Sequence, residues 1–268
     1  YLTSHGTLAW LAQRLFGVRA PLVGSAWGSD ILQAPERSAL LRALTRRVLA
    51  ACALTTSDSR HMAERMLALG AREVMTFPFG LEAMPAASTV KDRHLFFANR
   101  GLEPLYAPAR VIAFLAAIHA EWPDARMVVA NDGTLRAALE RDAGALGIAA
   151  AVRFAGRLGA EAQAHWYDRA QWYLSLPTSD SVSVSVLEAM AHGCIPLLSD
   201  LPANRELVES GRNGLVFADG TLADITELDR LQARADDIAA QNRAWIAEHA
   251  MFAPSVRAFL QRLRQLAP

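Results

Sequence analysis

The sequence lacks an excess of charge of either sign and lacks long hydrophobic runs. Its 27 basic and 27 acidic residues give a formal net charge of zero, so there is no basic surplus to neutralise the phosphates of a nucleic acid. No run of about eighteen apolar residues, which a membrane-spanning helix requires, is found. We therefore expect neither a nucleic-acid partner nor a transmembrane segment.

Patterns typical of metal sites and disulfides are also scarce. The two cysteines, Cys52 and Cys194, lie in apolar stretches and indicate small buried side chains rather than a disulfide or a metal pair. The histidines are not spaced as metal ligands, and no Asp-x-Asp pair follows a predicted strand. We expect no metal and no cofactor, and a reducing cytoplasm is the simplest location. Lys91 is the single lysine among the 27 basic residues, and alanine is abundant, a bias typical of GC-rich bacterial genomes.

What the chain does contain is a regular alternation of strand and helix patterns. A length of 268 residues with 52% hydrophobic content suits two modest cores. A first series of elements is predicted at 8–16 (helix), 20–26 (strand), 36–51 (helix), 53–56 (strand), 59–70 (helix) and 73–78 (strand). Residues 82–93 show no clear period and are the predicted linker.

A second alternating series follows this linker. Its predicted elements are 94–99 (strand), 108–121 (helix), 126–131 (strand), 134–146 (helix), 152–155 (strand), 160–170 (helix), 172–176 (strand) and 184–192 (helix), with terminal helices at 234–250 and 255–266. Crossovers of helical length imply parallel strands and a doubly wound α/β sheet. Ligands of such sheets bind beyond the carboxyl ends of the strands.

The segment 178–200, TSDSVSVSVLEAMAHGCIPLLSD, is the most informative part of the chain. Asp180 falls in a predicted strand-to-helix turn, and Glu188 lies eight positions later within the helix. Free backbone N–H groups at the start of that helix, around Ser183 to Ser185, would favour an anion such as a pyrophosphate. The segment is therefore suited to a ligand that carries both phosphate and hydroxyl groups.

The same segment and the one after it resemble the retaining glycosyltransferases of family 4, also called glycosyl transferases group 1. The resemblance rests on an acidic residue seven positions before a helix of the form LEAMA-x-G, and on the downstream segment SD-x-PA-x-x-ELV-x-x-G-x-NGL-x-F. The matching residues are Asp180, 187–193, Ser199, Asp200, Pro202, 206–208, Gly211, 213–215 and Phe217. One departure is Asp180, where the family usually has glutamate.

The resemblance implies an α/β fold of the GT-B type, with two Rossmann-like doubly wound domains facing a cleft. Residues 1–82 would be part of the N-terminal acceptor-side domain, which would be incomplete because the family's preceding glycine-rich loop has no counterpart here. Residues 94–250 would form the C-terminal donor-binding domain, and residues 251–268 a helix that crosses back to the first domain. Because Tyr1 lies in what reads as the middle of a helix, we expect that it is not the natural N-terminus.

The resemblance also assigns roles on the donor side. Glu188 would bind the nucleotide ribose; the alternative is a carboxylate that complements the helix dipole. Asp180 would contact the transferred sugar, or else form an Asx-turn or a helix cap. Ser183, Val184 and Ser185 would offer hydroxyl and N–H groups to phosphate, and ordinary capping is the alternative for the serines.

Further donor-side residues follow the other strands of the second series. Arg100 would neutralise the diphosphate, whose negative charge grows as it leaves. The lysine that usually follows in the family is replaced here, at Leu105 or Tyr106. The remaining residues lie at predicted strand ends: Gly133, in an Asn-Asp-Gly turn near the phosphates, and Phe154 and Gly156, beside the base.

On the acceptor side, Trp27, Gly28 and Asp30 end the first strand. Gly28 would allow close backbone approach, and Asp30 equally suits a cap of the next helix. Several arginines give the helix at 36–51 a basic face. Such faces are usually solvated; the alternative is a surface that docks on an anionic membrane or a lipid-linked acceptor, at the inner face of the membrane.

Together these features predict a metal-independent hexosyltransferase. It would move a sugar, with retention, from a nucleoside-diphosphate-sugar donor to a glycan or lipid-linked acceptor in bacterial cell-envelope polysaccharide synthesis. The alternative is a catalytically weakened nucleotide-sugar-binding module that acts as an interaction or regulatory subunit. The replaced lysine and the aspartate at position 180 favour this second hypothesis.

Overall fold

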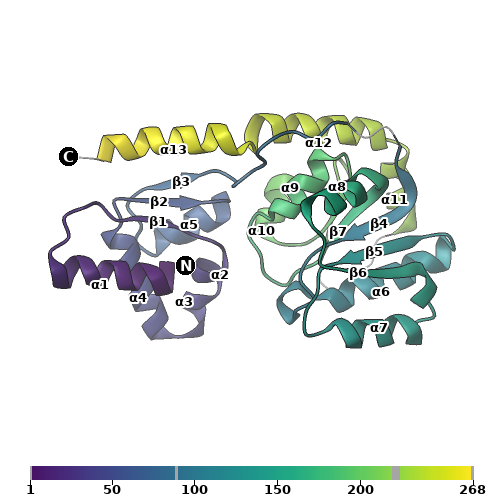
Figure 1. Cartoon of the computed structure of the whole chain (residues 1–268), viewed down its shortest axis with the longest axis horizontal. Helices are drawn as coiled ribbons and strands as arrows, with labels where there is room; N and C mark the ends of the chain where they lie inside the picture. Colours follow the sequence, from purple (N-terminus) through teal and green to yellow (C-terminus); the bar gives the residue numbers. More distant parts are fainter. Residues whose placement is uncertain (1, 88–89, 219–223, 267–268) are drawn as a thin grey trace. The chain divides into compact units, whose positions relative to one another are not determined.

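A computed structural model of the chain describes residues 2–87, 90–218 and 224–266 (Figure 1). These residues divide into two compact units. The first unit contains the described residues of Tyr1–Glu82, Ser179–Val182 and His249–Pro268, and the second those of Ala83–Thr178 and Ser183–Glu248. Each unit is described below on its own.

The first unit is built on a small parallel sheet in the order β1-β2-β3. Its strands are β1 (Val23–Ser25), β2 (Leu54–Ser57) and β3 (Val74–Thr76). Its helices are the π-helix η1 (Leu2–Gly6), α1 (Thr7–Phe16), α2 (Ser29–Leu32), α3 (Ala34–Arg37), α4 (Ala39–Ala51), α5 (Arg60–Ala68) and α13 (Phe252–Leu266). The hydrophobic core of this unit contains large apolar side chains, among them Ile31, Val48, Leu49, Met62 and Met66.

One predicted helix of this unit is divided in two. Ser38 is in an extended conformation, with φ −161° and ψ 152°, and therefore separates α3 from α4. Its hydroxyl accepts a hydrogen bond of 3.2 Å from the backbone N–H of Leu41, which makes it the N-cap of α4. The helical period of residues 36–51 is thus interrupted by a local serine cap that periodicity does not reveal.

The second unit is a larger sheet of parallel strands in the order β6-β5-β4-β7-β8-β9. The strands are β4 (Asp92–Ala98), β5 (Arg126–Ala130), β6 (Val152–Gly156), β7 (Ala170–Ser175), β8 (Ile195–Ser199) and β9 (Leu215–Phe217). The helices are η2 (Pro104–Tyr106), α6 (Pro108–Glu121), α7 (Arg136–Ala145), η3 (Ala149–Ala151), α8 (Ala160–Arg169), α9 (Val184–Ala191), α10 (Pro202–Leu207), α11 (Ile225–Gln232) and α12 (Ala235–His249).

The strand order of the second unit fixes where a ligand can bind. The chain moves from β4 outward to β6 and then returns to the centre, where β7 pairs with the other side of β4. A crevice forms at such a reversal, because the loops after the two central strands turn to opposite faces of the sheet. Here those loops begin at Asn99 and at Leu176.

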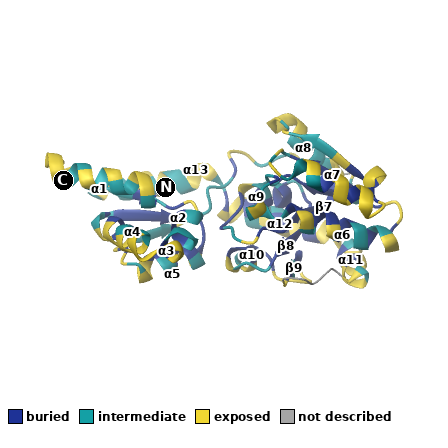
Figure 2. Ribbon diagram, turned by 90° about the horizontal axis from the view of Figure 1, so that it is seen from below, coloured by how far each residue is buried: buried dark blue, intermediate teal, exposed yellow. Residues whose placement is uncertain are grey.

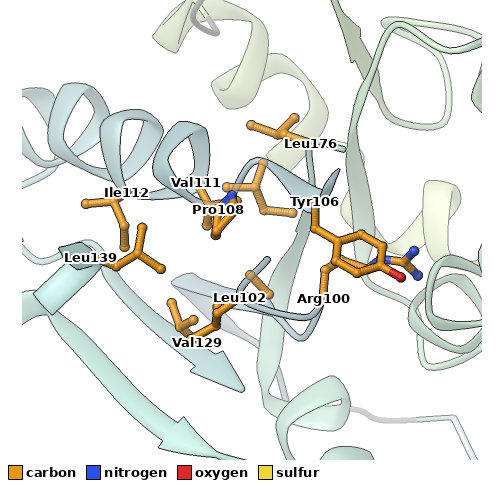
Figure 3. A pocket seen from close by; sticks show the side chains of 11 residues that line it. Arg100, Leu102, Tyr106, Pro108, Val111, Ile112, Val129, Leu139 and Leu176 are labelled. Atoms are coloured by element: carbon orange, nitrogen blue, oxygen red, sulfur yellow. The ribbon is translucent and has the colours of Figure 1, made fainter. Parts of the chain in front are cut away.

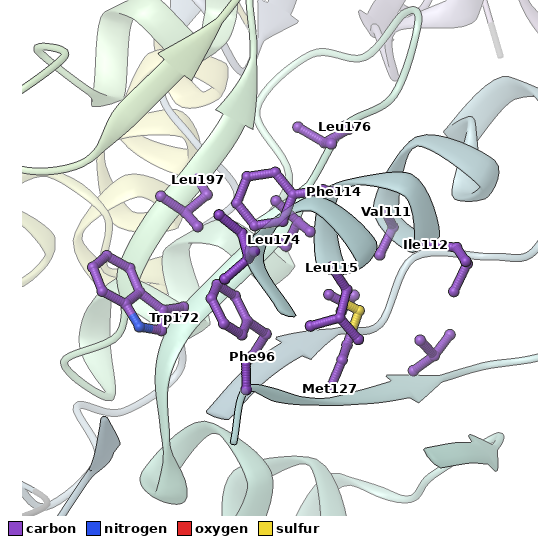
Figure 4. Packing of buried hydrophobic residues seen from close by; sticks show 14 of the residues in the cluster. Phe96, Val111, Ile112, Phe114, Leu115, Met127, Trp172, Leu174, Leu176 and Leu197 are labelled. Carbon is purple, nitrogen blue, oxygen red and sulfur yellow. The ribbon is translucent and has the colours of Figure 1, made fainter. Parts of the chain in front are cut away.

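Alternate residues of the central strands pack against opposite layers of helices. Phe96 and Trp172 stack at 5.9 Å between ring centroids and belong to the core cluster that includes α6 (Figure 4). Phe97 and Tyr173 point to the other face, where Phe97 meets the Tyr167 ring of α8 edge-on at 5.0 Å. The strands are accordingly buried, while the outer helix faces are exposed (Figure 2).

Lys91 anchors the amino-terminal side of this sheet, although it falls within the segment expected to be a linker. Its Nζ donates hydrogen bonds of 2.7 Å to the carbonyl of Tyr167 and of 2.7 Å to that of His192. These carbonyls lie in the final turn of α8 and at the C-cap of α9, where the helix dipole favours a positive charge. The single lysine of the chain therefore has a structural role.

Candidate active site

Arg100 lies at the carboxyl end of β4, in the loop that opens the crevice of the second unit. Its Nη1 donates a hydrogen bond to the Ser183 hydroxyl, and its guanidinium Cζ lies 4.5 Å from the centre of the Tyr106 ring (Figure 3). The Tyr106 ring faces the cation, a favourable cation–π arrangement that also restricts the arginine side chain. A fixed positive charge is thus held beside the residue that precedes α9.

The start of α9 offers backbone N–H groups next to this charge. Ser183 is the N-cap residue, yet within the described residues its side chain makes no capping hydrogen bond and instead accepts from Arg100. The first N–H groups of any α-helix lack intrahelical acceptors, and the helix dipole is positive at that end. For α9 these groups belong to Val184 and Ser185. The predicted alternative of serine capping does not describe Ser183, and the arrangement suits an anion.

Glu188 lies one turn further along α9 and is only partly buried. Its Oε2 accepts a hydrogen bond of 3.0 Å from the Tyr167 hydroxyl. Burial raises the pKa of the Glu188 carboxyl above its ordinary value, while the Tyr167 hydrogen bond and the nearby His192 lower it. The carboxylate is thus an acceptor held in place by a buried tyrosine, and among the described residues no hydrogen bond is made to its other oxygen.

Gly133 packs directly against the loop that carries Arg100. A Cβ placed on Gly133 would lie 2.4 Å from the Leu102 carbonyl oxygen, so only glycine fits there. The two backbones are joined by hydrogen bonds from Leu102 N to Asp132 O and from Leu135 N to Leu102 O. Gly133 therefore holds the loops after β4 and β5 together, and its close approach leaves no space for a ligand on the side facing Leu102.

Gly156 and Phe154 lie in β6, at the edge of the sheet. Gly156 has φ +68°, a left-handed conformation that favours glycine, and its carbonyl accepts a 2.6 Å hydrogen bond from Asn131 N. Phe154 is partly buried and packs against the core cluster. A cavity of about 210 Å³ opens beside these strand ends, and its lining comprises Asn99, Ala130, Asn131, Arg157, Leu158 and Gln163.

The residues predicted for the acceptor side lie in the first unit. Trp27 is 59% exposed and stacks on Phe79 with ring centroids 4.4 Å apart. Asp30 is buried and accepts hydrogen bonds from the backbone N–H of Trp27 (3.0 Å) and of Leu2 (2.9 Å). Gly28, with φ +102°, is the N-cap of α2, so Asp30 binds back to preceding backbone rather than capping that helix.

Asp180 belongs to the short segment Ser179–Val182, which packs within the first unit. Its Oδ1 accepts a 3.0 Å hydrogen bond from the N–H of the next residue, Ser181, whereas an Asx-turn would join it to the N–H two residues on. The Ser181 hydroxyl is bonded to the buried carboxylate of Asp58. The Asp58 pKa is raised to about 6: burial and, to a smaller extent, the charge of Asp180 raise it, while hydrogen bonds from Ser181 and from the Val182 N–H lower it.

The structure brings together one part of the predicted site. Its second unit holds Arg100, Gly133, Phe154, Gly156, Ser183, Val184, Ser185 and Glu188, whereas Trp27, Gly28, Asp30 and Asp180 belong to the first unit. Sequence reasoning missed Asn99, Tyr167 and Asp58. Asn99 could have been found from the sequence, because it is a polar residue at the end of a buried strand. Tyr167 could not, because it occupies an ordinary apolar position in the helical pattern.

The described residues contain neither a cluster of metal ligands nor a helix suited to span a membrane. Within residues 2–87, 90–218 and 224–266, no group of three or more His, Cys, Asp or Glu side chains is placed to share a metal ion. Over the same residues, none of the helices combines the length and the apolar character that crossing a bilayer requires.

The comparison with known families gives a match to glycosyl transferases group 1 over residues 96–230. This region amounts to half of the chain and, apart from Ser179–Val182, lies in the second unit. The chain belongs to this family. The matched region includes Arg100, Ser183 and Glu188, so the crevice described above lies inside the part of the chain that defines membership. A search among proteins of characterised function gave no match.

Several solved structures have a similar fold. HepE of Anabaena, solved in complex with UDP, matches with a TM-score of 0.81 and 16% identity over 98% of this chain and 77% of its own. Sucrose-phosphate synthase of Thermosynechococcus elongatus matches with a TM-score of 0.81 and 14% identity over 97% of this chain and 71% of its own. The pneumococcal O-GlcNAc transferase GtfA, solved with UDP and GlcNAc, matches with a TM-score of 0.76 and 14% identity over 97% of this chain.

These similarities confirm the predicted GT-B fold with two Rossmann-like α/β units. The first of them, built on a three-stranded sheet, is the smaller. The chain spans 55% of the length of GtfA, about half of that relative. At identities between 14% and 16% the similarity concerns the fold.

Proposed function

We propose that this chain is the nucleotide-sugar-binding part of a retaining, metal-independent glycosyltransferase. The observation that carries the proposal is the meeting of Arg100, the start of α9 and Glu188 at the strand reversal of the family-matched unit. The donor would be a nucleoside-diphosphate hexose, and UDP is the first nucleotide to test because HepE and GtfA were solved with it.

Each group of this crevice suits one part of the donor. Arg100 and the N–H groups at the start of α9 would stabilise the diphosphate as its charge grows during departure. Glu188 would accept hydrogen bonds from the ribose hydroxyls. The base would enter the cavity near Phe154 and Gly156, and Gly133 would shape the loop beside the phosphates.

The residues of the first unit suit the acceptor side. Asp180 would orient the transferred sugar, and Trp27, Gly28 and Asp30 would belong to the acceptor side of the site. A glycan or a lipid-linked acceptor of bacterial cell-envelope polysaccharide synthesis would suit these roles, at the cytoplasmic face of the membrane. The exposed Trp27 ring, stacked on the half-buried Phe79, supports this assignment, since aromatic faces are suitable contacts for the apolar faces of sugars.

A direct test combines UDP titration calorimetry with an assay of sugar release from UDP-hexoses. Arg100→Met should lower the rate of donor cleavage by about 100-fold, because it removes a preorganised positive charge that would stabilise the departing diphosphate. Arg141→Met, which removes an exposed arginine from α7, is the matched control and should leave the rate unchanged. Equal rates for the parent and Arg100→Met would contradict the assignment of Arg100.

A second candidate function is a nucleotide-sugar-binding module without turnover. The specific observation in its favour is the Tyr106 ring, which lies against Arg100 near the position where the family usually supplies a lysine. Under this alternative the chain would bind UDP, and Glu188→Ala would weaken that binding, but no donor cleavage would be detected with any acceptor. Turnover that depends on Arg100 would exclude it.

A further inference from the structure

The hydroxyl of Tyr167 is the centre of a buried polar network in the second unit. The residue is 2% exposed, and its oxygen lies 2.7 Å from Asn99 Nδ2, 3.0 Å from Glu188 Oε2 and 3.3 Å from the Ser185 carbonyl. Burial raises the Tyr167 pKa well above its ordinary value, so the hydroxyl keeps its proton throughout the neutral range.

The direction of each hydrogen bond in this network follows from which side-chain atoms can donate and which can only accept. Asn99 accepts from the Tyr173 hydroxyl through Oδ1 (2.8 Å) and uses Nδ2 to donate to Gln163 Oε1 (2.6 Å) and to the Tyr167 oxygen. Because Tyr167 receives a hydrogen from Asn99, its single proton is free to point onward. The nearer of its two acceptors is Glu188 Oε2.

We propose that Tyr167 is a positioning residue, which holds Glu188 as a fixed, ionised acceptor for the ribose hydroxyls of the donor nucleotide. This inference rests on the proposed function of Glu188. The network is directional, since Tyr173, Asn99 and Tyr167 each donate to the next group and the series ends at the carboxylate. A donor aimed at Oε2 stabilises the charged form and fixes the side-chain rotamer, which leaves Oε1 for the ligand.

The consequence is a dependence of nucleotide affinity on pH. A protonated Glu188 is a poor acceptor, so affinity should fall as pH drops through its pKa, which burial already raises and Tyr167 lowers. His192, at the C-cap of α9, acts on the Glu188 carboxyl, and Tyr173 of β7 acts on the Tyr167 hydroxyl. His192 is paired with Asp168 of α8 at 2.8 Å. Removing the Tyr167 hydroxyl should therefore move the fall in affinity to higher pH.

The test measures UDP affinity of the full chain by calorimetry between pH 5 and pH 8.5 for the parent and for Tyr167→Phe. We expect the ratio of the two dissociation constants to be smallest at pH 8.5 and to grow by about tenfold as the pH falls below the pKa of Glu188 in both proteins, the size of one hydrogen bond to a charged group. Tyr173→Phe is the matched control. It deletes a hydroxyl from the same network that bonds to Asn99 and not to Glu188, so its ratio should stay nearly constant with pH.

A second ligand and two further variants separate the positioning role of Tyr167 from the ribose-binding role of Glu188. With 2′,3′-dideoxyuridine diphosphate, which lacks the ribose hydroxyls, the ratio for Tyr167→Phe should not depend on pH. If Tyr167→Phe does not fold, Asn99→Ala should give the same trend at smaller amplitude, since it removes the donor that orients the Tyr167 hydroxyl. A constant ratio for Tyr167→Phe with UDP would overturn the positioning role alone, whereas UDP affinity that is unchanged by Glu188→Ala would overturn the ribose assignment beneath it.

Discussion

Replacing Asp58 with asparagine should stabilise the first unit at neutral pH. Asp58 is 7% exposed, and burial raises the pKa of its carboxyl from an ordinary 3.8 to about 6. The folded state therefore binds the proton more tightly than the unfolded state, so folding stability is lost as pH rises from about 4 to about 6. Asparagine has the same shape, keeps an oxygen for the Ser181 hydroxyl and the Val182 N–H, and cannot ionise.

The size of the effect follows from the two pKa values. At 1.36 kcal/mol for each pH unit between 3.8 and about 6, ionised Asp58 costs about 3 kcal/mol at pH 7.5. At pH 4.5 the cost is about 1 kcal/mol, because the folded carboxyl is then almost fully protonated. Asp58→Asn should therefore exceed the parent in stability by about 3 kcal/mol at pH 7.5 and by about 1 kcal/mol at pH 4.5.

Hydrogen exchange of the backbone amides of β2 and α5 is the suitable assay, because it reports the opening free energy of the first unit separately from that of the second. Ser181→Ala provides a second variant. It deletes a donor to the Asp58 carboxylate, so it should destabilise the unit more at pH 7.5 than at pH 4.5. A stability difference between Asp58→Asn and the parent that is the same at both pH values would refute the reasoning, as would a variant that is less stable at pH 7.5.

Two other predictions concern the second unit. Lys91→Met should lower the free energy of unfolding by about 2 kcal/mol, measured by chemical denaturation, because the carbonyls of Tyr167 and His192 lose a charged donor at two helix ends. An unchanged free energy of unfolding would show that solvent satisfies these carbonyls equally well. Gly133→Ala should destabilise the unit by about 1–3 kcal/mol and weaken UDP binding, because the added Cβ would meet the Leu102 carbonyl and push the two loops apart. A variant with the stability and UDP affinity of the parent would contradict this prediction.

The alternation of elements in the second unit could be predicted from the sequence because it depends on local patterns. Continuous apolar runs indicated β4, β5 and β7, and a helical period indicated α6 and α8 between them. Shorter elements such as α10 and β9 were not predicted, since a few residues carry too little periodicity. The break at Ser38 was missed for the related reason that one serine cap outweighs a continuous helical pattern.

Part of the candidate site also followed from local sequence. Ser183 was a candidate because it directly precedes a predicted helix, whose first N–H groups favour an anion, and Arg100, at the end of a predicted strand, was a candidate through the family resemblance. Their hydrogen bond across 83 positions of sequence was not predictable from spacing. It depends on β7 pairing beside β4, and strand pairing is decided by contacts between segments that are far apart in the chain.

By itself, then, the sequence determined the α/β class, the family motifs around Glu188 and the set of candidate strand-end residues. The tertiary structure decided what those residues contact. Tyr167 became a partner of Glu188 because α8 and α9 cover the same face of the sheet, and Asp58 became a buried carboxylate because the segment Ser179–Val182 packs over it. The burial of a side chain and its hydrogen-bond partners depend on neighbours from several helices and strands at once. A local sequence pattern does not contain this information.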